Sequence, residues 1–166
     1  MITTEKITTV QQLEEIAEQF LIENFNLKLN IPIRISNRMS KTLGHFSVVI
    51  NTVTGVKRAK DIAISGNLLR HYKTEEAIDT LKHECVHYAL FMLGKPYQDG
   101  QNYFEKTLKQ LGVSSTRTTE FKGKVHVYGC TSCNYQFHRV RRFNVSSYRC
   151  GKCKGSLAYI KQELVK

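Results

Sequence analysis

The stretch that decides the fold is His83-Glu84-Cys85-Val86-His87, an H-E-x-x-H sequence inside a segment of helical periodicity. Residues four apart on a helix project from one face, so both imidazoles can bind one Zn²⁺ while the glutamate reaches its water. The metal acidifies that water, and the carboxylate takes its proton as the water attacks a carbonyl. The motif therefore predicts a zinc hydrolase with Glu84 as general base. The alternative is an incidental pair of helical histidines.

The residues around this motif favour a helix. Thr74 is the predicted N-cap, and two glutamates follow in the first turn, where the helix dipole favours negative charge. Gly94 and Pro96 mark the predicted end. Apolar residues at three- and four-residue steps predict a buried stripe of Ile78, Leu81, Cys85 and Ala89. Cys85 is thus expected to be a small buried apolar residue rather than a catalytic thiol.

A catalytic zinc takes three protein ligands and leaves a fourth position to water. The candidates for the third ligand are His45, His71, Asp99, Glu105 and His126. Asp99 is preferred, because it follows the helix in a loop, residues 95–100, that can fold back over the helix face. The alternative is a solvent-facing aspartate in an Asp-Gly turn.

Four of the five cysteines form two C-x-x-C pairs, the first at Cys130 and Cys133 and the second at Cys150 and Cys153. In a reducing compartment this spacing predicts a structural zinc site of four thiolates, with disulfides as the disfavoured alternative. Glycines before and around the pairs, at positions 129, 151 and 155, are expected to provide the tight turns.

Periodicity predicts an α+β fold. Helical spacing covers residues 10–25, the motif helix and residues 102–111, and strand-like runs cover residues 31–36, 45–50 and 61–65. Shorter alternating runs at 125–128, 137–140 and 157–160 predict the hairpins of a small β-rich zinc ribbon. The predicted domains are residues 1–120, in the order helix, three-stranded sheet, H-E-x-x-H helix, further helix, and residues 121–166, joined at a polar boundary near 116–122.

Charge is concentrated in the last part of the chain. Residues 121–166 carry ten Lys and Arg and a single acidic residue, whereas residues 1–120 are nearly balanced, with 15 Lys and Arg against 13 Asp and Glu. Aromatic residues lie among these cations, a combination typical of single-strand nucleic-acid binding. The candidate nucleic-acid contacts are Arg139, Arg141, Arg142 and Arg149. A merely soluble basic surface, or a purely structural ribbon, is the alternative.

No apolar run approaches the length of a membrane span, and Met1 is not followed by a signal sequence. A cytoplasmic protein without a membrane partner is therefore expected.

Together, residues 81–87, the loop Tyr97-Gln98-Asp99-Gly100, the helix containing Phe104 and the terminal Cys150-Gly-Lys-Cys153 resemble the SprT-like family, which is related to the Spartan-type DNA-dependent metalloproteases. The resemblance covers nearly the whole chain. It implies a zincin-like domain followed by a zinc ribbon, with zinc on His83 and His87 and with Glu84 as general base. The family usually has histidine where this chain has Asp99, and an aspartate oxygen can also bind a catalytic zinc.

The expected function is a zinc-dependent metalloprotease acting on proteins associated with nucleic acid, with one catalytic and one structural zinc. Two alternatives are an adaptor that binds nucleic acid through its ribbon and has an inactive zincin domain, and a hydrolase of small amides. Tyr97, Tyr103 and Arg117 are candidates for stabilising an oxyanion, and nothing in the sequence chooses among them. The strand at 62–65 is expected to be an edge strand that pairs with an extended peptide substrate.

Overall fold

The computed structural model describes residues 6–39, 42–115 and 120–166. The chain divides into two compact units, residues 1–120 and residues 121–166. Residues 116–119 of the predicted boundary, and with them Arg117, lie outside the described residues. The α+β class is confirmed.

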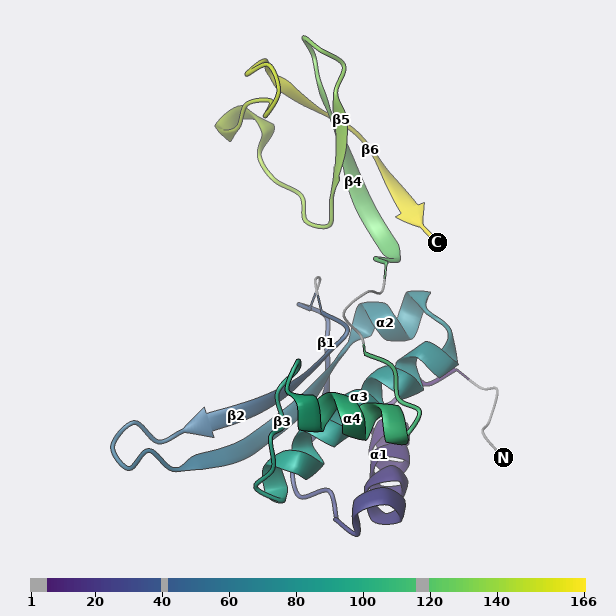
Figure 1. Ribbon diagram of the computed structural model, residues 1–166. Coiled ribbons are helices and arrows are strands. Elements are labelled where there is room, and N and C mark those ends of the chain that lie inside the picture. The colour runs from purple at the N-terminus through teal and green to yellow at the C-terminus, as the bar shows by residue number, and fades with distance from the viewer. Residues whose placement is uncertain (1–5, 40–41, 116–119) are drawn as a thin grey trace. The chain divides into compact units, whose positions relative to one another are not determined.

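The described part of the first unit holds a three-stranded sheet and four α-helices (Figure 1). The strands β1 (Ile33–Ser36), β3 (Lys57–Ser65) and β2 (Gly44–Ile50) lie in that order. β1 is parallel to β3, and β2 is antiparallel to it. β3 is therefore the central strand, and the prediction that its residues 62–65 form a sheet edge is wrong. The error arose because a short apolar run does not reveal how many neighbours a strand has.

The first helix, α1 (Val10–Phe25), begins and ends where its residues provide caps. The Thr9 hydroxyl accepts from the Gln12 N–H at 3.2 Å, and the Gln12 side chain accepts from the Thr9 N–H at 3.1 Å. Asn26 closes the helix in the left-handed conformation at φ 53°. The reciprocal hydrogen bonds satisfy backbone N–H groups that the first turn leaves without a partner inside the helix.

The motif helix, α3 (Thr74–Met92), is the centre of the first unit. It contacts α1, the two strands β2 and β3, and α4 (Asn102–Gln110), so eleven of its nineteen residues are buried. The predicted stripe was too narrow, because a helix covered on several sides has no solvent face of ordinary width. Thr74 is the first helical residue rather than the N-cap. The cap is Lys73, whose N–H donates to the Glu76 carboxylate at 2.9 Å.

Between β3 and α3 lies a short helix that the sequence did not reveal, α2 (Gly66–His71). Its cap is the Ser65 hydroxyl, which accepts from the Asn67 N–H at 3.2 Å. Six residues are too few to show a helical period, which is why the pattern suggested only the end of a strand.

The second unit is an antiparallel sheet in the order β5 (Gln136–Arg139), β4 (Gly123–Cys130), β6 (Leu157–Val165), with a 3₁₀ turn at Val145–Ser147. All three predicted ribbon strands are present, and β4 and β6 extend beyond their predicted bounds. Cys130 is the last residue of β4, Cys133 lies on the turn that follows it, and Cys150 and Cys153 lie in the turn region before β6. We call residues 121–166 the ribbon. Among the described residues, none of the helices is both long and apolar enough to cross a membrane.

Candidate metal centres and nucleic-acid surface

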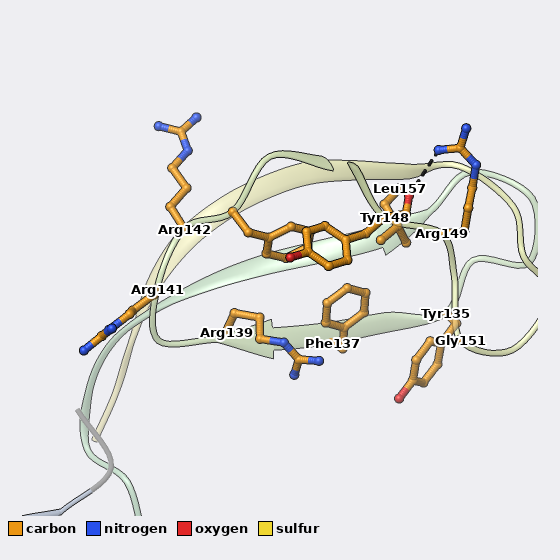
Figure 2. A pocket seen from close by; sticks show the side chains of 10 residues that line it. Tyr135, Phe137, Arg139, Arg141, Arg142, Tyr148, Arg149, Gly151 and Leu157 are labelled. Carbon is orange, nitrogen blue, oxygen red and sulfur yellow. Dashed lines mark hydrogen bonds between the residues drawn. The ribbon is translucent and has the colours of Figure 1, made fainter. Parts of the chain in front are cut away.

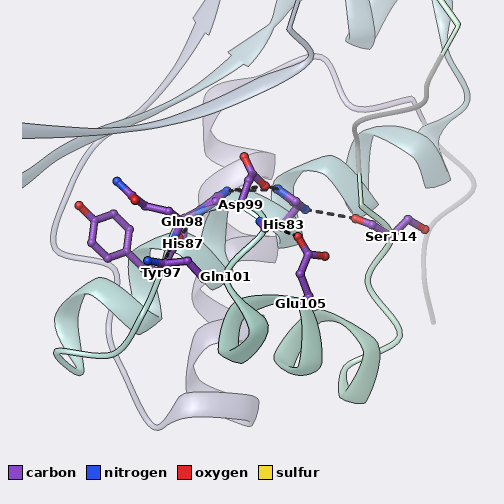
Figure 3. Close-up of polar contacts among 9 residues, drawn as sticks. His83, His87, Tyr97, Gln98, Asp99, Gln101, Glu105 and Ser114 are labelled. Atoms are coloured by element: carbon purple, nitrogen blue, oxygen red, sulfur yellow. Dashed lines mark hydrogen bonds and ion pairs between the residues drawn. The ribbon is translucent and has the colours of Figure 1, made fainter.

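His83 and His87 point their Nε2 atoms toward one another, 3.2 Å apart, from successive turns of α3. Asp99 Oδ1 lies 3.2 Å from His83 Nε2 and 3.6 Å from His87 Nε2 (Figure 3). In a tetrahedral zinc site with bonds of about 2.0–2.1 Å, ligand atoms are separated by about 3.3 Å. The three donor atoms are therefore spaced as zinc ligands are, and their types suit zinc.

The other predicted third ligands do not join this group. Glu105 accepts a hydrogen bond from the Gly100 N–H at 2.8 Å and so holds the loop that carries Asp99. Gly100 itself has φ 80°, a conformation that glycine adopts without strain. His126 belongs to the ribbon, on β4. Neither His45 nor His71 is in the group of donor atoms found among the described residues.

Both histidines are oriented through their Nδ1 atoms, which bond backbone carbonyls. His83 Nδ1 donates to the Ser114 carbonyl at 3.2 Å, and His87 Nδ1 donates to the Tyr97 carbonyl. A proton on Nδ1 leaves the Nε2 lone pair available to a metal. Burial lowers the pKa of His87, which favours the neutral ring that a metal requires.

Phe104 on α4 holds both rings and was not identified as a site residue from the sequence. It is fully buried, stacks on the His87 ring at 4.2 Å between centroids and meets the His83 ring edge-on at 5.3 Å. Its side chain belongs to the buried core of the first unit. Only the fold shows that this core contact is made to the candidate ligands.

Glu84 is buried on the same helix, 4% exposed, under the first residues of β2. A Cβ at Gly44 would lie 2.6 Å from Glu84 Oε1, so glycine is required where β2 crosses this side chain. The pKa of Glu84 is raised to about 8, mainly by burial and also by the charge of Asp99, while a hydrogen bond from the Phe46 N–H opposes the shift.

Cys85 is completely buried in the core of the first unit. Burial raises the pKa of its thiol, so the thiolate that nucleophilic chemistry needs is disfavoured. Tyr97, one of the candidates for an oxyanion contact, instead packs its ring on Phe46 and Phe91, at 6.3 and 5.2 Å between centroids. Tyr103, another candidate for the oxyanion contact, has a side chain on the surface that is 47% exposed.

The four ribbon cysteines form the second group of metal donors. Cys130 Sγ lies 3.4 Å from Cys153 Sγ, and Cys133 Sγ lies 3.7 Å from Cys150 Sγ. A tetrahedral zinc with bonds of about 2.3 Å to sulfur separates its ligands by about 3.8 Å. The backbone N–H groups of Cys133 and Ser132 lower the pKa of Cys130 to about 6, which favours the thiolate.

The two cysteine turns repeat one hydrogen-bond pattern. The Cys130 N–H donates to the Tyr135 carbonyl and the Cys150 N–H to the Gly155 carbonyl, each at 2.9 Å. The left-handed residues are Asn134 and Lys154, at φ 55° and 63°, and not the glycines expected from the sequence. Gly155 is needed for another reason, because a Cβ there would lie 2.5 Å from Ser132 Oγ.

Beside the cysteine turns, the ribbon has a cavity of about 560 Å³. All four predicted arginines line it, together with Tyr135, Phe137, Phe143, Tyr148, Gly151 and Leu157 (Figure 2). The Arg139 guanidinium lies 5.0 Å from the Phe137 ring, and Arg149 donates to the Tyr148 carbonyl at 3.1 Å. Figure 2 shows Arg141 and Arg142 extending away from the rings that line the cavity. The Arg142 guanidinium lies over the Tyr159 ring, 4.6 Å from its centroid. The cavity thus combines flat apolar surfaces with positive charge.

Comparison with known proteins places this chain in a family. The model of the SprT-like family matches residues 10–126. Protein SprT-like from Bacillus cereus strain AH187 is 29% identical over 156 residues, which cover 92% of this chain and 97% of that protein. The proteins of the same name from Streptococcus gordonii and Bacillus anthracis strain A0248 are 29% identical over 155 residues and 28% identical over 158 residues. They cover 91% and 92% of this chain and 98% and 97% of their own lengths. The chain belongs to the SprT-like family.

Proposed function

We propose that this protein is a zinc-dependent metallopeptidase with a zincin-like first unit, acting on proteins associated with nucleic acid. The observation that carries the proposal is the convergence of His83 Nε2, His87 Nε2 and Asp99 Oδ1 to within 3.6 Å of one another. The four ribbon cysteines would hold a second, structural zinc. The family membership supports the same assignment.

The residues of the chain divide the chemistry among them. A bound Zn²⁺ would supply a Lewis acid and a local positive charge that lowers the pKa of water and of a nearby carboxyl. The Ser114 and Tyr97 carbonyls and the Phe104 ring hold the two imidazoles. Glu84, which is neutral near pH 7 without a metal because its pKa is about 8, would then ionise and accept the proton of the attacking water.

The strand suited to a peptide substrate is β2. It is at the edge of the sheet, and the Phe46 N–H in this strand bonds Glu84, so the strand borders the site. An extended peptide that added to this edge would be recognised mainly through its backbone. Broad specificity for side chains is the expected consequence.

The ribbon would bring the enzyme to its targets. Bases of a single strand can stack on the exposed rings of Tyr135 and Tyr148, while the arginines around the cavity neutralise phosphates. This contact requires no particular base sequence, because every base has a stacking face. The targets would be selected by their position on the nucleic acid.

The test uses the full chain loaded with zinc and a DNA-binding protein as substrate, with no DNA, single-stranded DNA or duplex DNA. Wild type should cleave the substrate more rapidly with DNA. Glu84→Gln should retain two zinc ions per chain and lose cleavage, since it keeps the size of the side chain and removes the base. Cleavage that survives Glu84→Gln would assign the activity to another protein and contradict the proposal.

A second candidate function is an adaptor that binds nucleic acid and has an inactive first unit. It is favoured by Asp99, whose negative charge replaces the histidine usual in the family and whose side chain is 47% exposed. An anionic ligand weakens the Lewis acidity of a metal. Salt-sensitive DNA binding with no cleavage under Zn²⁺, Mn²⁺ or Co²⁺ supplementation would establish this alternative.

A further inference from the structure

The hairpin formed by β2 and β3 continues beyond the core of the first unit, and Figure 1 shows its end free of the helices. We call residues 49–58 the hairpin arm. All ten of these residues are exposed, whereas the strand residues nearer the core, such as Phe46 and Ile62, are buried. The arm is thus a projection that the core does not require.

The turn at the end of the arm is held by its own hydrogen bonds. Asn51 Oδ1 accepts from the backbone N–H groups of Val53 and Thr54 at 2.9 and 3.1 Å, and the Asn51 N–H donates to the Val56 carbonyl at 2.9 Å. Gly55 has φ 70°, as this turn demands. The sequence therefore specifies a defined tip rather than a loose loop.

This defined tip presents aliphatic side chains to water. Val49, Ile50 and Val56 are about half exposed, and Val53 is 92% exposed. Single exposed aliphatic residues are ordinary, but four within eight positions of one projection form an apolar patch of the kind that contacts a partner.

The arm is also positively charged. Residues 42–60 contain Lys57, Arg58 and Lys60 and no Asp or Glu. In the strand register Lys57 is opposite Ile50 and Arg58 is opposite Val49. Because neighbouring residues of a strand point to opposite faces, cations lie on both faces of the arm. Among the described residues, neither Lys57 nor Arg58 has a carboxylate within ion-pair distance.

We propose that the hairpin arm inserts into a groove of duplex nucleic acid. The major groove of B-form DNA admits a two-stranded β-ribbon, and its two walls carry phosphates that cations on both faces of the arm could contact. The aliphatic tip would lie against base edges, where thymine methyl groups offer apolar contact. This contact is separate from the ribbon cavity, goes beyond the proposed function and does not depend on peptidase activity.

The distribution of charge favours a groove over a flat anionic membrane. A flat surface can be approached by only one face of the arm, which would leave either Lys57 or Arg58 in water. A groove surrounds the arm, so both cations contribute to binding. An anionic vesicle is therefore the appropriate competing ligand in a test.

The test measures binding of the zinc-loaded full chain to a 20-base-pair duplex and to a single-stranded thymidine oligonucleotide by fluorescence anisotropy. The arm variant carries Lys57→Gln and Arg58→Gln within the arm and Lys60→Gln next to it on β3. A control variant with the same loss of charge carries Lys28→Gln, Lys106→Gln and Lys109→Gln, all of them exposed outside the arm. All six substituted side chains are exposed, so both variants should fold, and circular dichroism checks this.

The arm variant should bind the duplex about tenfold more weakly or worse near physiological salt, and the slope of log K against log salt should become shallower by about 2 to 3. Its single-strand binding should change little, and the control variant should resemble wild type. Val53→Ser should weaken duplex binding without changing the salt slope, because it removes only apolar contact.

The proposal is overturned if the wild-type chain does not bind the duplex or if the arm and control variants lose the same affinity. It is also overturned if the arm substitutions reduce binding only to vesicles of phosphatidylglycerol and phosphatidylcholine. None of these measurements follows cleavage, so the result of this test is independent of the peptidase assay.

Discussion

Among the described residues, His83 and His87 project from a helix inside a core cluster of 22 buried residues. The four cysteines lie at the end of β4 and on the turns beside it, next to a cluster of three buried residues, two of which are cysteines. The ribbon adds only Val125, Val127 and Tyr128 to its buried apolar residues. The two units are therefore expected to differ in how much their folding depends on a bound metal. In the first unit, packing places the candidate ligands, and a bound metal would add chemistry. In the ribbon, a bound metal would provide much of what holds the module together.

Removal of one ribbon ligand tests this difference most strongly. Cys150→Ser should release one zinc and unfold residues 121–166, because the remaining apolar contacts cannot offset the conformational entropy of the chain. The measurement is a ¹H–¹⁵N NMR spectrum, in which ribbon resonances should lose dispersion while those of the first unit keep theirs.

The matched control is Cys85→Ala, which removes a thiol from the core of the first unit. It should keep two zinc ions and both sets of dispersed resonances, at a cost of about 1 kcal/mol in stability. Ribbon resonances that remain dispersed in Cys150→Ser would show that the ribbon folds without its metal, and the contrast between the units would fail.

In the first unit, loss of a ligand should change metal affinity and leave the fold intact. Asp99→Ala should weaken zinc binding at this site by at least about tenfold, since even changes behind the ligands commonly cost that much. Asp99→His should retain binding, because a histidine nitrogen is also a common zinc ligand. Competition with a chelator of known affinity measures both effects.

Glu18→Ala provides the control, as it removes an exposed carboxylate from α1 and should leave zinc affinity unchanged. If Asp99→Ala bound zinc as tightly as wild type, Asp99 would be a turn residue and not a ligand.

The elements that local sequence determines could be predicted from it. The helical period of residues 10–25, the spacing of His83 and His87 and the cysteine pairs each depend on residues a few positions apart. Asp99 was correctly placed near the histidines because the loop following a helix has few directions in which to fold.

The features that were missed depend on residues distant in sequence. The central position of β3 follows from pairing with two other strands, and the role of Phe104 follows from the packing of α4 on α3. The carbonyls of Tyr97 and Ser114 carry no sequence signal at all, because every residue has a carbonyl. Orientation of a ligand is thus harder to predict than its identity.

In a metal-free sample, the titration of Glu84 should make the stability of the first unit depend on pH. Its pKa is about 8 in the folded protein, against 4.5 for an ordinary glutamate. Between these values the unfolded chain is ionised while the folded chain keeps its proton, so the folded state loses stability as the pH rises from about 4.5 to 8. The loss reaches at most a few kcal/mol, at about 1.4 kcal/mol per pH unit. For Cys130 in the ribbon the direction is opposite, because backbone N–H donors lower the pKa of that thiol to about 6.

Because a glutamine side chain cannot ionise, Glu84→Gln should remove this dependence of stability on pH. In urea unfolding with EDTA, the variant and wild type should be nearly equal in stability at pH 4, and the variant should gain steadily up to pH 8 and no further above it. The ribbon is the same in both proteins, so it does not affect the difference. A difference independent of pH would mean that the buried carboxyl titrates normally.

The smallest expected effect comes from adding a methyl group to a closely packed glycine in each unit. Gly44→Ala would place a Cβ 2.6 Å from Glu84 Oε1 and 2.9 Å from Thr80 Cγ2, on buried side chains that have little room to move. Overpacking of this kind costs about 1–3 kcal/mol. Gly129→Ala in the ribbon would meet Ile160 Cδ1 at 2.9 Å, but that atom ends a side chain that is 45% exposed and can turn away. Urea unfolding of the zinc-loaded proteins should therefore show a loss of stability for Gly44→Ala and almost none for Gly129→Ala. If the order were reversed, the ribbon would be the more tightly packed unit, and a metal would not be needed to explain how so small a core stays folded.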